Sequence, residues 1–256
     1  MEGAGDIKRN DFFFIRGQMT SKNIPVQDRL ILALDVPTIA QARELVELMG
    51  DTVNFYKVGL ELFVSGDYFA FTDWLCARGN KVFFDLKFFD VPETVRSAVR
   101  QLRNRGAGFV TVHGNDAILR AAVEEKGDLK ILAVTALTSL DQADMEDLGF
   151  KCNVEELVLS RARRALEIGC DGVISSGLEA RRLRAHLDDK FLIITPGIRP
   201  VSNTEDDQKR TVGVEEAFSN GADYIVVGRP IRNADDPRAT AQEIQAQILR
   251  FFASQA

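Results

Sequence analysis

The stretch Lys81-Val82-Phe83-Phe84-Asp85-Leu86-Lys87-Phe88-Phe89-Asp90-Val91-Pro92 leads from a hydrophobic run into a cluster of charges and then into the start of a helix. Residues 81–86 are predicted to form a buried β-strand, because the run is short, aliphatic and aromatic. Side chains alternate between the two faces of a strand, so Asp85 and Lys87 share one face. Pro92 suits the first position of a helix, where its missing N–H costs nothing. The stretch therefore predicts a strand–helix unit with two charges where the strand ends.

The same unit repeats along the chain from Arg29 onward. Amphipathic helical patterns separate the apolar runs, and over residues 92–103 the side chains of Val95, Val99 and Leu102 fall on one helix face. Strands that alternate with helices in this way imply a parallel sheet buried on both sides, either closed or open. The eight predicted strands are 30–34, 54–58, 81–86, 109–112, 130–135, 172–175, 191–195 and 224–227.

The first predicted strand favours the closed form of the sheet. In an open dinucleotide-binding sheet this strand runs into a glycine-rich turn that holds phosphate. Here residues 30–34 run into Asp35-Val36-Pro37 instead, so we expect no nicotinamide cofactor. The length of 256 residues matches the roughly 250 of a barrel of eight strand–helix units. The predicted fold class is α/β, a single (β/α)8 TIM barrel over residues 28–256 with eight parallel strands and outer helices.

Residues 1–27 lie outside the repeating pattern. They mix charges with the apolar run at residues 12–15, which is shorter than the roughly 7 to 15 apolar residues of a secretory signal. We expect a disordered N-terminal extension, with Met19 as an alternative start.

The composition argues against several classes of partner. A net charge of −6 without a long basic run gives no general attraction to nucleic acid or to an anionic membrane. No apolar run approaches the ~18 to 20 residues that span a bilayer. Cys76, Cys152 and Cys170 are scattered and lack CxxC spacing, so neither a disulfide framework nor a zinc site is expected. We expect a cytoplasmic protein with reduced thiols.

Four charged residues lie near the ends of the first three predicted strands, where barrels place their active sites. These are Asp35, Lys57, Asp85 and Lys87, and Phe83 shares the inward face with the last two. Desolvated charges are costly unless they pair. Alternating carboxylates and ammonium groups are nearly neutral together, need no metal and keep each lysine protonated. Lys87 is therefore a candidate general acid.

Two further residues near these ends are ambiguous. Asp90 either completes the charged set or caps the helix that begins at Pro92. Thr138 follows the fifth strand and either hydrogen-bonds a ligand or is structural. His113 and His186 are too far apart in sequence to indicate a metal site, so we expect no metal.

The loops after the last two strands form a candidate phosphate site, as in many barrels. Arg199 follows the seventh strand, and its planar guanidinium suits phosphate oxygens. Gly228 and Arg229 follow the eighth, where the glycine lets backbone amides approach an anion. The polar segment 201–211, which includes Gln208, is predicted to be a lid or an ordinary solvated loop.

With residues 30–37, 56–59, 85–94 and 196–199 in this order, the chain resembles the orotidine 5'-monophosphate decarboxylase family. The resemblance runs from about Arg29 to the final helix, and 85–94 carries its specific signature. It implies a cofactor-free carboxy-lyase that releases CO2 from orotidine monophosphate. The product is uridine monophosphate, in the last step of pyrimidine nucleotide synthesis.

The resemblance also implies a role for each matching residue. Lys87 would donate a proton to C6 of the pyrimidine, and Asp85 would lie beside the departing carboxylate. Asp90 and Thr94 would reach the site of the neighbouring subunit, which implies a homodimer. The remaining roles are the charge network (Lys57 and Asp90), the ribose (Asp35 and Lys57), the pyrimidine (Thr138), the lid (Gln208) and the phosphate (Arg199, Gly228 and Arg229).

Two alternatives stay open. One is a metal-dependent decarboxylase of the 3-keto-gulonate 6-phosphate type in the same superfamily, which resembles this chain except for an acidic metal ligand where Lys57 stands. An ammonium at that position should repel Mg²⁺. The other is a non-catalytic phosphate-binding barrel that serves as a regulator or scaffold.

Overall fold

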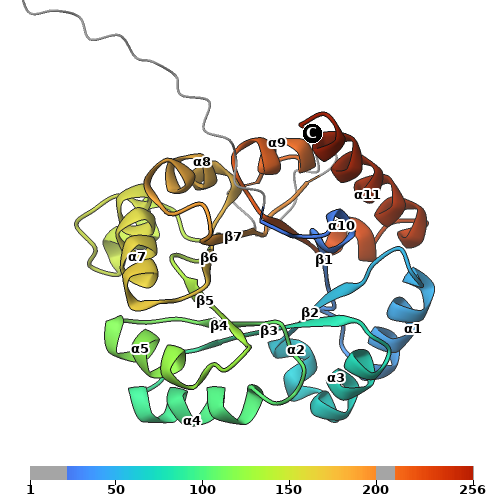
Figure 1. Cartoon of the computed structure of the whole chain (residues 1–256), viewed down its shortest axis with the longest axis horizontal. Helices are drawn as coiled ribbons and strands as arrows, with labels where there is room; N and C mark the ends of the chain where they lie inside the picture. The colour runs from blue at the N-terminus through green and yellow to red at the C-terminus, as the bar shows by residue number, and fades with distance from the viewer. Residues whose placement is uncertain (1–21, 200–210, 256) are drawn as a thin grey trace, which may run out of the picture.

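The structure is a computed structural model that describes residues 22–199 and 211–255. Its eight described strands form one closed barrel in the order of the sequence (Figure 1). Each strand is parallel to both neighbours, and β1 pairs with β8 to close the ring. The predicted (β/α)8 barrel is therefore confirmed. The strands are β1 (Leu30–Ala33), β2 (Phe55–Gly59), β3 (Lys81–Phe88), β4 (Phe109–Val112), β5 (Lys130–Val134), β6 (Gly172–Ile174), β7 (Leu192–Thr195) and β8 (Tyr224–Val227).

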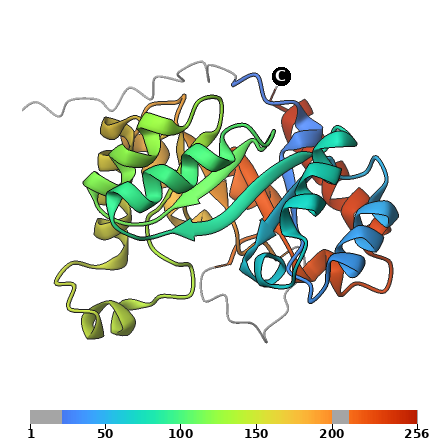
Figure 2. The same ribbon diagram turned by 90° about the horizontal axis from the view of Figure 1, so that it is seen from below.

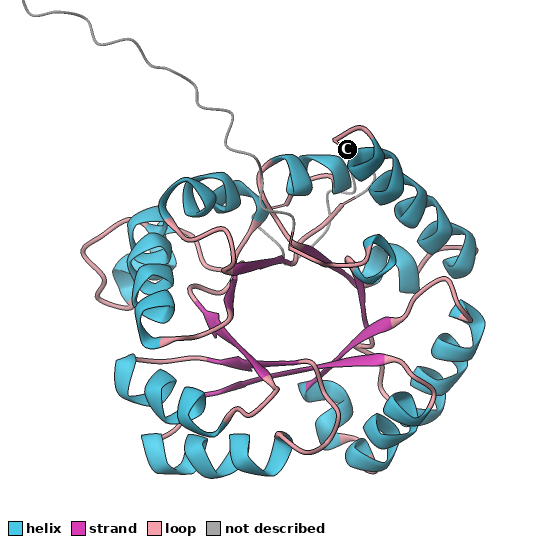
Figure 3. Ribbon diagram, viewed as in Figure 1, coloured by secondary structure: helices cyan, strands magenta, loops and turns pink. Residues whose placement is uncertain are grey.

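The helices form a ring around the strands (Figure 3). Several helices are capped at their N-termini by a side chain. Thr38 accepts a hydrogen bond from the Gln41 amide, and Asp236 accepts one from the Ala239 amide. The helices are η1 (Val26–Asp28, a 3-10 turn), α1 (Ile39–Met49), α2 (Leu60–Val64), α3 (Tyr68–Ala77), α4 (Pro92–Leu102), α5 (Asp116–Glu125), α6 (Gln142–Asp147), α7 (Val154–Ile168), α8 (Gly177–His186), α9 (Val214–Ser219), α10 (Arg229–Arg232) and α11 (Pro237–Ala253).

The strands bury both of their faces, which is why their sequences are almost wholly apolar. One face packs against the helices in a continuous core, and the other fills the barrel interior. Aromatic side chains occupy much of the interior: the ring of Phe55 lies 5.1 Å from that of Phe109, and Phe83 packs on Phe109 at 5.9 Å. Phe83 thus faces inward, as the alternation of side chains predicts. The filled interior leaves polar groups at the ends of the barrel.

Within the predicted N-terminal extension, residues 22–27 are described by the structure and contact the barrel. Lys22 donates to a carboxylate oxygen of Asp223 at 2.5 Å and to the carbonyl of Phe191 at 2.8 Å, and Ile24 packs on the interior core. These contacts place Lys22 and Ile24 against the barrel, and the domain boundary at residue 28 stays a prediction. The prediction of disorder for residues 1–21 lies outside the described residues.

The two ends of the barrel differ. Figure 2 shows the segment between β5 and α7, which carries α6, projecting at one end, whereas the blue N-terminal segment and the C-terminal end of α11 lie at the other. Across the described ranges, no helix combines the length and the apolar character needed to cross a membrane.

Candidate active site

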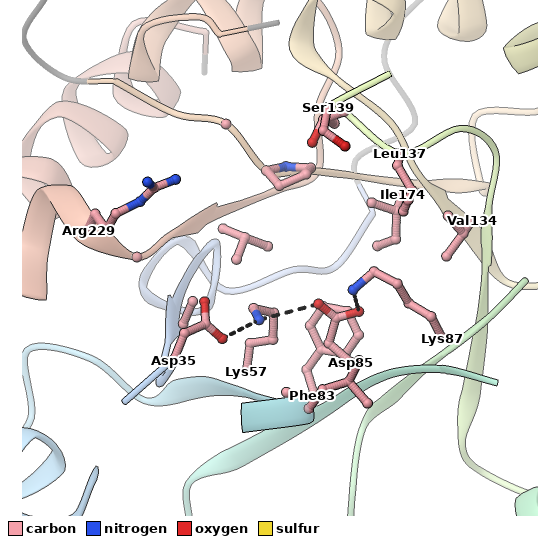
Figure 4. A pocket seen from close by; sticks show the side chains of 18 of the residues that line it. Asp35, Lys57, Phe83, Asp85, Lys87, Val134, Leu137, Ser139, Ile174 and Arg229 are labelled. Atoms are coloured by element: carbon pink, nitrogen blue, oxygen red, sulfur yellow. Dashed lines mark hydrogen bonds and ion pairs between the residues drawn. The ribbon is translucent and has the colours of Figure 1, made fainter. Parts of the chain in front are cut away.

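A cavity of about 450 Å³ opens where the strands end at their carboxyl termini (Figure 4). Its walls come from strands and loops far apart in the sequence, because a closed parallel barrel brings all of its strand ends to one rim. The lining includes eight of the predicted site residues: Asp35, Lys57, Asp85, Lys87, Thr138, Arg199, Gly228 and Arg229.

The four charged residues from the first three strands form a continuous chain, as drawn in Figure 4. The Nζ of Lys57 lies 2.8 Å from Oδ1 of Asp35 and 3.3 Å from Oδ2 of Asp85. The Nζ of Lys87 lies 2.9 Å from Oδ1 of Asp85. Negative and positive groups therefore alternate from Asp35 to Lys87, and each lysine contacts at least one carboxylate. We refer to these four residues as the charge chain.

Burial and pairing act in opposite directions on the charge chain. Burial alone would lower the pKa of Lys57, but the carboxylates of Asp85 and Asp35 outweigh it and raise that pKa above its usual value. Burial alone would raise the pKa of Asp85, but Lys57 and Lys87 outweigh it and lower that pKa. Both groups are therefore held in their charged forms at neutral pH.

Thr111 is a site residue that the sequence interpretation missed. Its hydroxyl donates to Oδ1 of Asp85 at 2.9 Å and accepts from the backbone amide of Lys87 at 2.9 Å. Thr111 is fully buried on β4, two residues after the inward-facing Phe109. The same alternation that places Phe83 and Asp85 on one face could have identified it.

The backbone of Lys87 departs from regular strand geometry. Its φ is 48°, in the left-handed region that side chains other than glycine rarely adopt. The pairing of β3 with β4 shifts register between Phe84 and Phe88, so the irregularity spans the two charged positions. Such conformations persist where surrounding contacts hold them, and they gather at functional sites. Here the hydrogen bond from the Lys87 amide to Thr111 provides one such contact.

Gly59 makes room for the charge chain at the end of β2. A Cβ at this position would lie 3.2 Å from Oδ1 of Asp35 and 3.3 Å from Nζ of Lys57. Both distances are tighter than ordinary contacts, and the second atom is fixed between two carboxylates. Gly59 is therefore the residue type that fits beside this ion pair.

The three predicted phosphate residues also line the cavity. Arg229 lies across it from Lys87 in Figure 4. Arg199 follows β7 and donates from Nη1 to its neighbouring carbonyl at Ile198, at 2.8 Å. Arg229 opens α10 directly after Gly228. The cavity thus has a mixed-charge end and an arginine-rich end.

Several other predicted residues lie elsewhere. Asp90 and Thr94 are exposed and do not line the cavity of their own chain. The carboxylate of Asp90 accepts from the Val91 amide at 2.6 Å, and α4 has no side-chain cap, so Asp90 does not cap this helix. Gln208 and most of the predicted lid lie outside the described residues.

The two histidines make their described contacts with residues outside the charge chain. His113 is half-buried against the ring of Phe89 at 5.2 Å, and its Nδ1 has no hydrogen-bond partner. Burial lowers its pKa, and the nearby charges of Arg161 and Lys87 lower it further. His186 contacts the Arg182 carbonyl at a helix end.

The fold and the cavity together define a class of protein: a (β/α)8-barrel enzyme with charged groups at one end of its mouth and arginines suited to an anion at the other. Residues 28–244 match the model of the orotidine 5'-phosphate decarboxylase / HUMPS family. The chain belongs to this family, which confirms the resemblance seen in the sequence.

Similar proteins cover nearly the whole chain. The orotidine 5'-phosphate decarboxylase of Methylococcus capsulatus is 65% identical over 237 residues, which are 92% of this chain and 98% of the relative. That of Nitrobacter winogradskyi is 51% identical over 221 residues, 85% of this chain and 91% of the relative. A crystal structure of the Lactobacillus acidophilus orotidine 5'-phosphate decarboxylase has 35% identity and a TM-score of 0.77, over 86% of this chain and 99% of that one.

Proposed function

We propose that this chain releases CO2 from orotidine 5'-monophosphate to give uridine 5'-monophosphate, the final step of pyrimidine nucleotide synthesis. The charge chain is the observation that carries the proposal, because it sets a cationic proton donor and a fixed anion side by side at the mouth. The near full-length similarity to proteins named for this activity supports the same substrate.

Lys87 is the proposed proton donor. The bond between C6 of the pyrimidine and its carboxylate breaks, CO2 leaves, and the electron pair stays on C6. A proton then passes from Nζ of Lys87 to C6, and the resulting neutral amine regains a proton from solvent. A fixed ammonium stabilises the developing negative charge without reorganisation, which is the main way in which such sites lower a barrier.

Lys57 and Asp85 are proposed to hold Lys87 in its reactive form and place. Asp85 contacts both lysines, and its negative charge contributes to the raised pKa of Lys57. In the proposed complex Asp85 also lies beside the departing carboxylate. Asp35 and Lys57 are proposed to contact the ribose, and Thr138 the pyrimidine.

Arg199, Gly228 and Arg229 are proposed to bind the 5'-phosphate, with Gln208 as a further contact. Arg229 lies across the cavity from Lys87 in Figure 4, so a phosphate bound there would be remote from the reacting carbon. Binding energy from a remote group can be used to exclude water and orient the reacting part of the substrate. Loss of this contact should therefore weaken binding first.

We also propose a homodimer with shared active sites, in which Asp90 and Thr94 contribute to the site of the partner subunit. Both residues are exposed in a single chain and lie beside further exposed apolar side chains. Phe89 is 68% exposed and Val91 63% exposed, which is unfavourable for large apolar groups unless another surface covers them. A second copy would bury these residues and bring Asp90 next to a second cavity.

The proposed location is the cytoplasm. Cys76, Cys152 and Cys170 are all free thiols, and Cys170 is buried. Free thiols are typical of reducing compartments.

The metal-dependent alternative is disfavoured by Lys57. Its ammonium lies between two carboxylates that a divalent ion could otherwise use, and it would repel that ion. Among the described residues, no cluster of three or more His, Cys, Asp or Glu side chains is arranged to hold a metal.

One assay tests the proposed function. The purified protein is mixed with orotidine 5'-monophosphate, and the loss of pyrimidine absorbance is followed with and without a strong chelator. We expect the same rate in both samples. No absorbance change would refute the decarboxylase, and a loss of activity with chelator would favour the metal-dependent alternative.

A further inference from the structure

Arg232 lines the cavity one helical turn after Arg229, at the end of the short helix α10. Its Nη1 donates a hydrogen bond to the backbone carbonyl of Asp35. Its Nε is buried without a hydrogen-bond partner. No carboxylate within residues 22–199 and 211–255 forms an ion pair with Arg232. Its described hydrogen bond is the one to the Asp35 carbonyl.

Asp35 lies outside the regular sheet. Strand β1 ends at Ala33, and the side chain of Asp35 is 41% exposed. Its carboxylate contacts Lys57, whereas its backbone carbonyl contacts Arg232. Two cations from different elements therefore fix this one loop residue, one through its side chain and one through its backbone.

These contacts join the two ends of the cavity. From Arg232 the contacts run to Asp35, then to Lys57 and Asp85, and finally to Lys87. We propose that Arg232 is a positioning residue: it ties helix α10 to Asp35 and so fixes the Asp35 carboxylate against Lys57. This inference rests on the proposed function, because it assigns Arg232 to the same reaction.

The side chain also lines a second hollow. That hollow of about 320 Å³ lies between α1 and α10, and its lining includes Val36, Leu45 and Arg232. A truncation to alanine would remove bulk from the linings of both spaces as well as the hydrogen bond. Arg232→Met is the better test, because it keeps most of the bulk and removes the hydrogen bond. Arg232→Lys keeps the charge and a donor.

The experiment measures two constants for the wild type, both Arg232 variants, and Arg238→Met as the control. Arg238 is an exposed arginine on α11 and is not among the residues that line the cavity. Its Nη2 lies 3.7 Å from Oδ1 of Asp51. The constants are kcat with orotidine 5'-monophosphate and the inhibition constant of inorganic phosphate. Arg229→Ala serves as the reference for a lost phosphate contact, and thermal unfolding confirms that each variant is folded.

A positioning role predicts that Arg232→Met lowers kcat about 10-fold, because Asp35 would no longer be held in place against Lys57 and the reacting groups would be less well aligned. The phosphate inhibition constant should change less than about twofold, because phosphate binding is not the lost contact. Arg232→Lys should recover most of kcat, and Arg238→Met should match the wild type.

Three results would overturn the inference. An unchanged kcat in Arg232→Met would show that Asp35 needs no such contact. A phosphate inhibition constant raised as much as in Arg229→Ala would make Arg232 a direct phosphate ligand instead. An inactive wild type would refute the proposed function, and this inference with it.

Discussion

The ammonium of Lys57 lies 3.3 Å from Oδ2 of Asp85, and the two side chains are only 11% and 13% exposed. Removing either charge would leave the other buried with one oppositely charged neighbour fewer, because Lys57 would keep only Asp35 and Asp85 only Lys87. The second carboxylate oxygen of Asp85 meets Lys87 and the Thr111 hydroxyl. Asp85 is therefore the residue about which the other groups of the site are arranged.

Thr111→Val should slow the reaction without removing any charge. The substitution keeps the shape of the side chain but leaves the Lys87 amide and Oδ1 of Asp85 without their shared hydroxyl. We expect kcat to fall about tenfold, because Lys87 loses a contact that holds its unusual backbone conformation. Steady-state kinetics check this, with Thr111→Ser as a control that keeps the hydroxyl and stays within about threefold of wild type. Equal rates for the Val and Ser variants would contradict it.

Arg229→Ala should act mainly on binding. A charged hydrogen bond to phosphate is worth about 1.5–3 kcal/mol, so KM should rise about 10- to 100-fold. Because Arg229 is remote from Lys87, kcat should change far less than KM. The comparison of the two constants is the measurement, and a variant with unchanged KM and lowered kcat would argue that Arg229 is not a phosphate ligand.

Mixed dimers test the proposed shared site. Lys87→Ala and Asp90→Ala homodimers should each be nearly inactive, because each carries a defect in both sites. In a mixed dimer, one chain carries Lys87→Ala and the other carries Asp90→Ala. One shared site then contains both substitutions, and the other site contains neither. The activity of the mixed dimer should recover to about half that of wild type, as measured after refolding differently tagged chains together. Mixed dimers as inactive as their parents would rule out the shared arrangement.

Lys22 should make stability depend on pH above neutrality. Burial lowers its pKa from 10.5 to about 8, although Asp223 partly opposes the shift. Between these values the unfolded chain holds a proton that the folded chain has lost, so stability from this group rises with pH. The free energy of unfolding of wild type minus that of Lys22→Met should therefore increase by about 1–3 kcal/mol from pH 8 to pH 10.5.

Denaturant unfolding at several pH values measures that difference. Below about pH 7 it should be nearly constant, since Lys22 is then protonated in both states. A difference that stays flat across the higher range would show that Lys22 is not buried as the structure has it.

The parts of the fold that repeat locally were predictable from sequence. The pattern of a hydrophobic run followed by a helix, as around Asp85, occurs eight times along the chain. A parallel barrel places the ends of all these strands together. Asp35, Lys57, Asp85 and Lys87 could therefore be expected at one mouth before any geometry was known.

The features that the sequence did not indicate depend on contacts between distant segments. The left-handed backbone of Lys87 arises where β3 shifts register against β4, and no residue type marks that shift. Residues 22–27 look like a polar tail, but Lys22 finds its partner in Asp223, at the other end of the chain. Arg232 lies beyond the recognisable motif at Gly228 and Arg229, and only the fold brings it to Asp35.

Lys87 is proposed to protonate the pyrimidine as CO2 leaves, and the Lys87→Ala variant removes that proton donor. Decarboxylation of orotidine 5'-monophosphate is followed by absorbance, and uridine 5'-monophosphate binding is measured by calorimetry on the same protein. The account predicts that turnover is nearly abolished while the product still binds with an affinity close to that of wild type. Turnover that stays close to wild type in Lys87→Ala would contradict it.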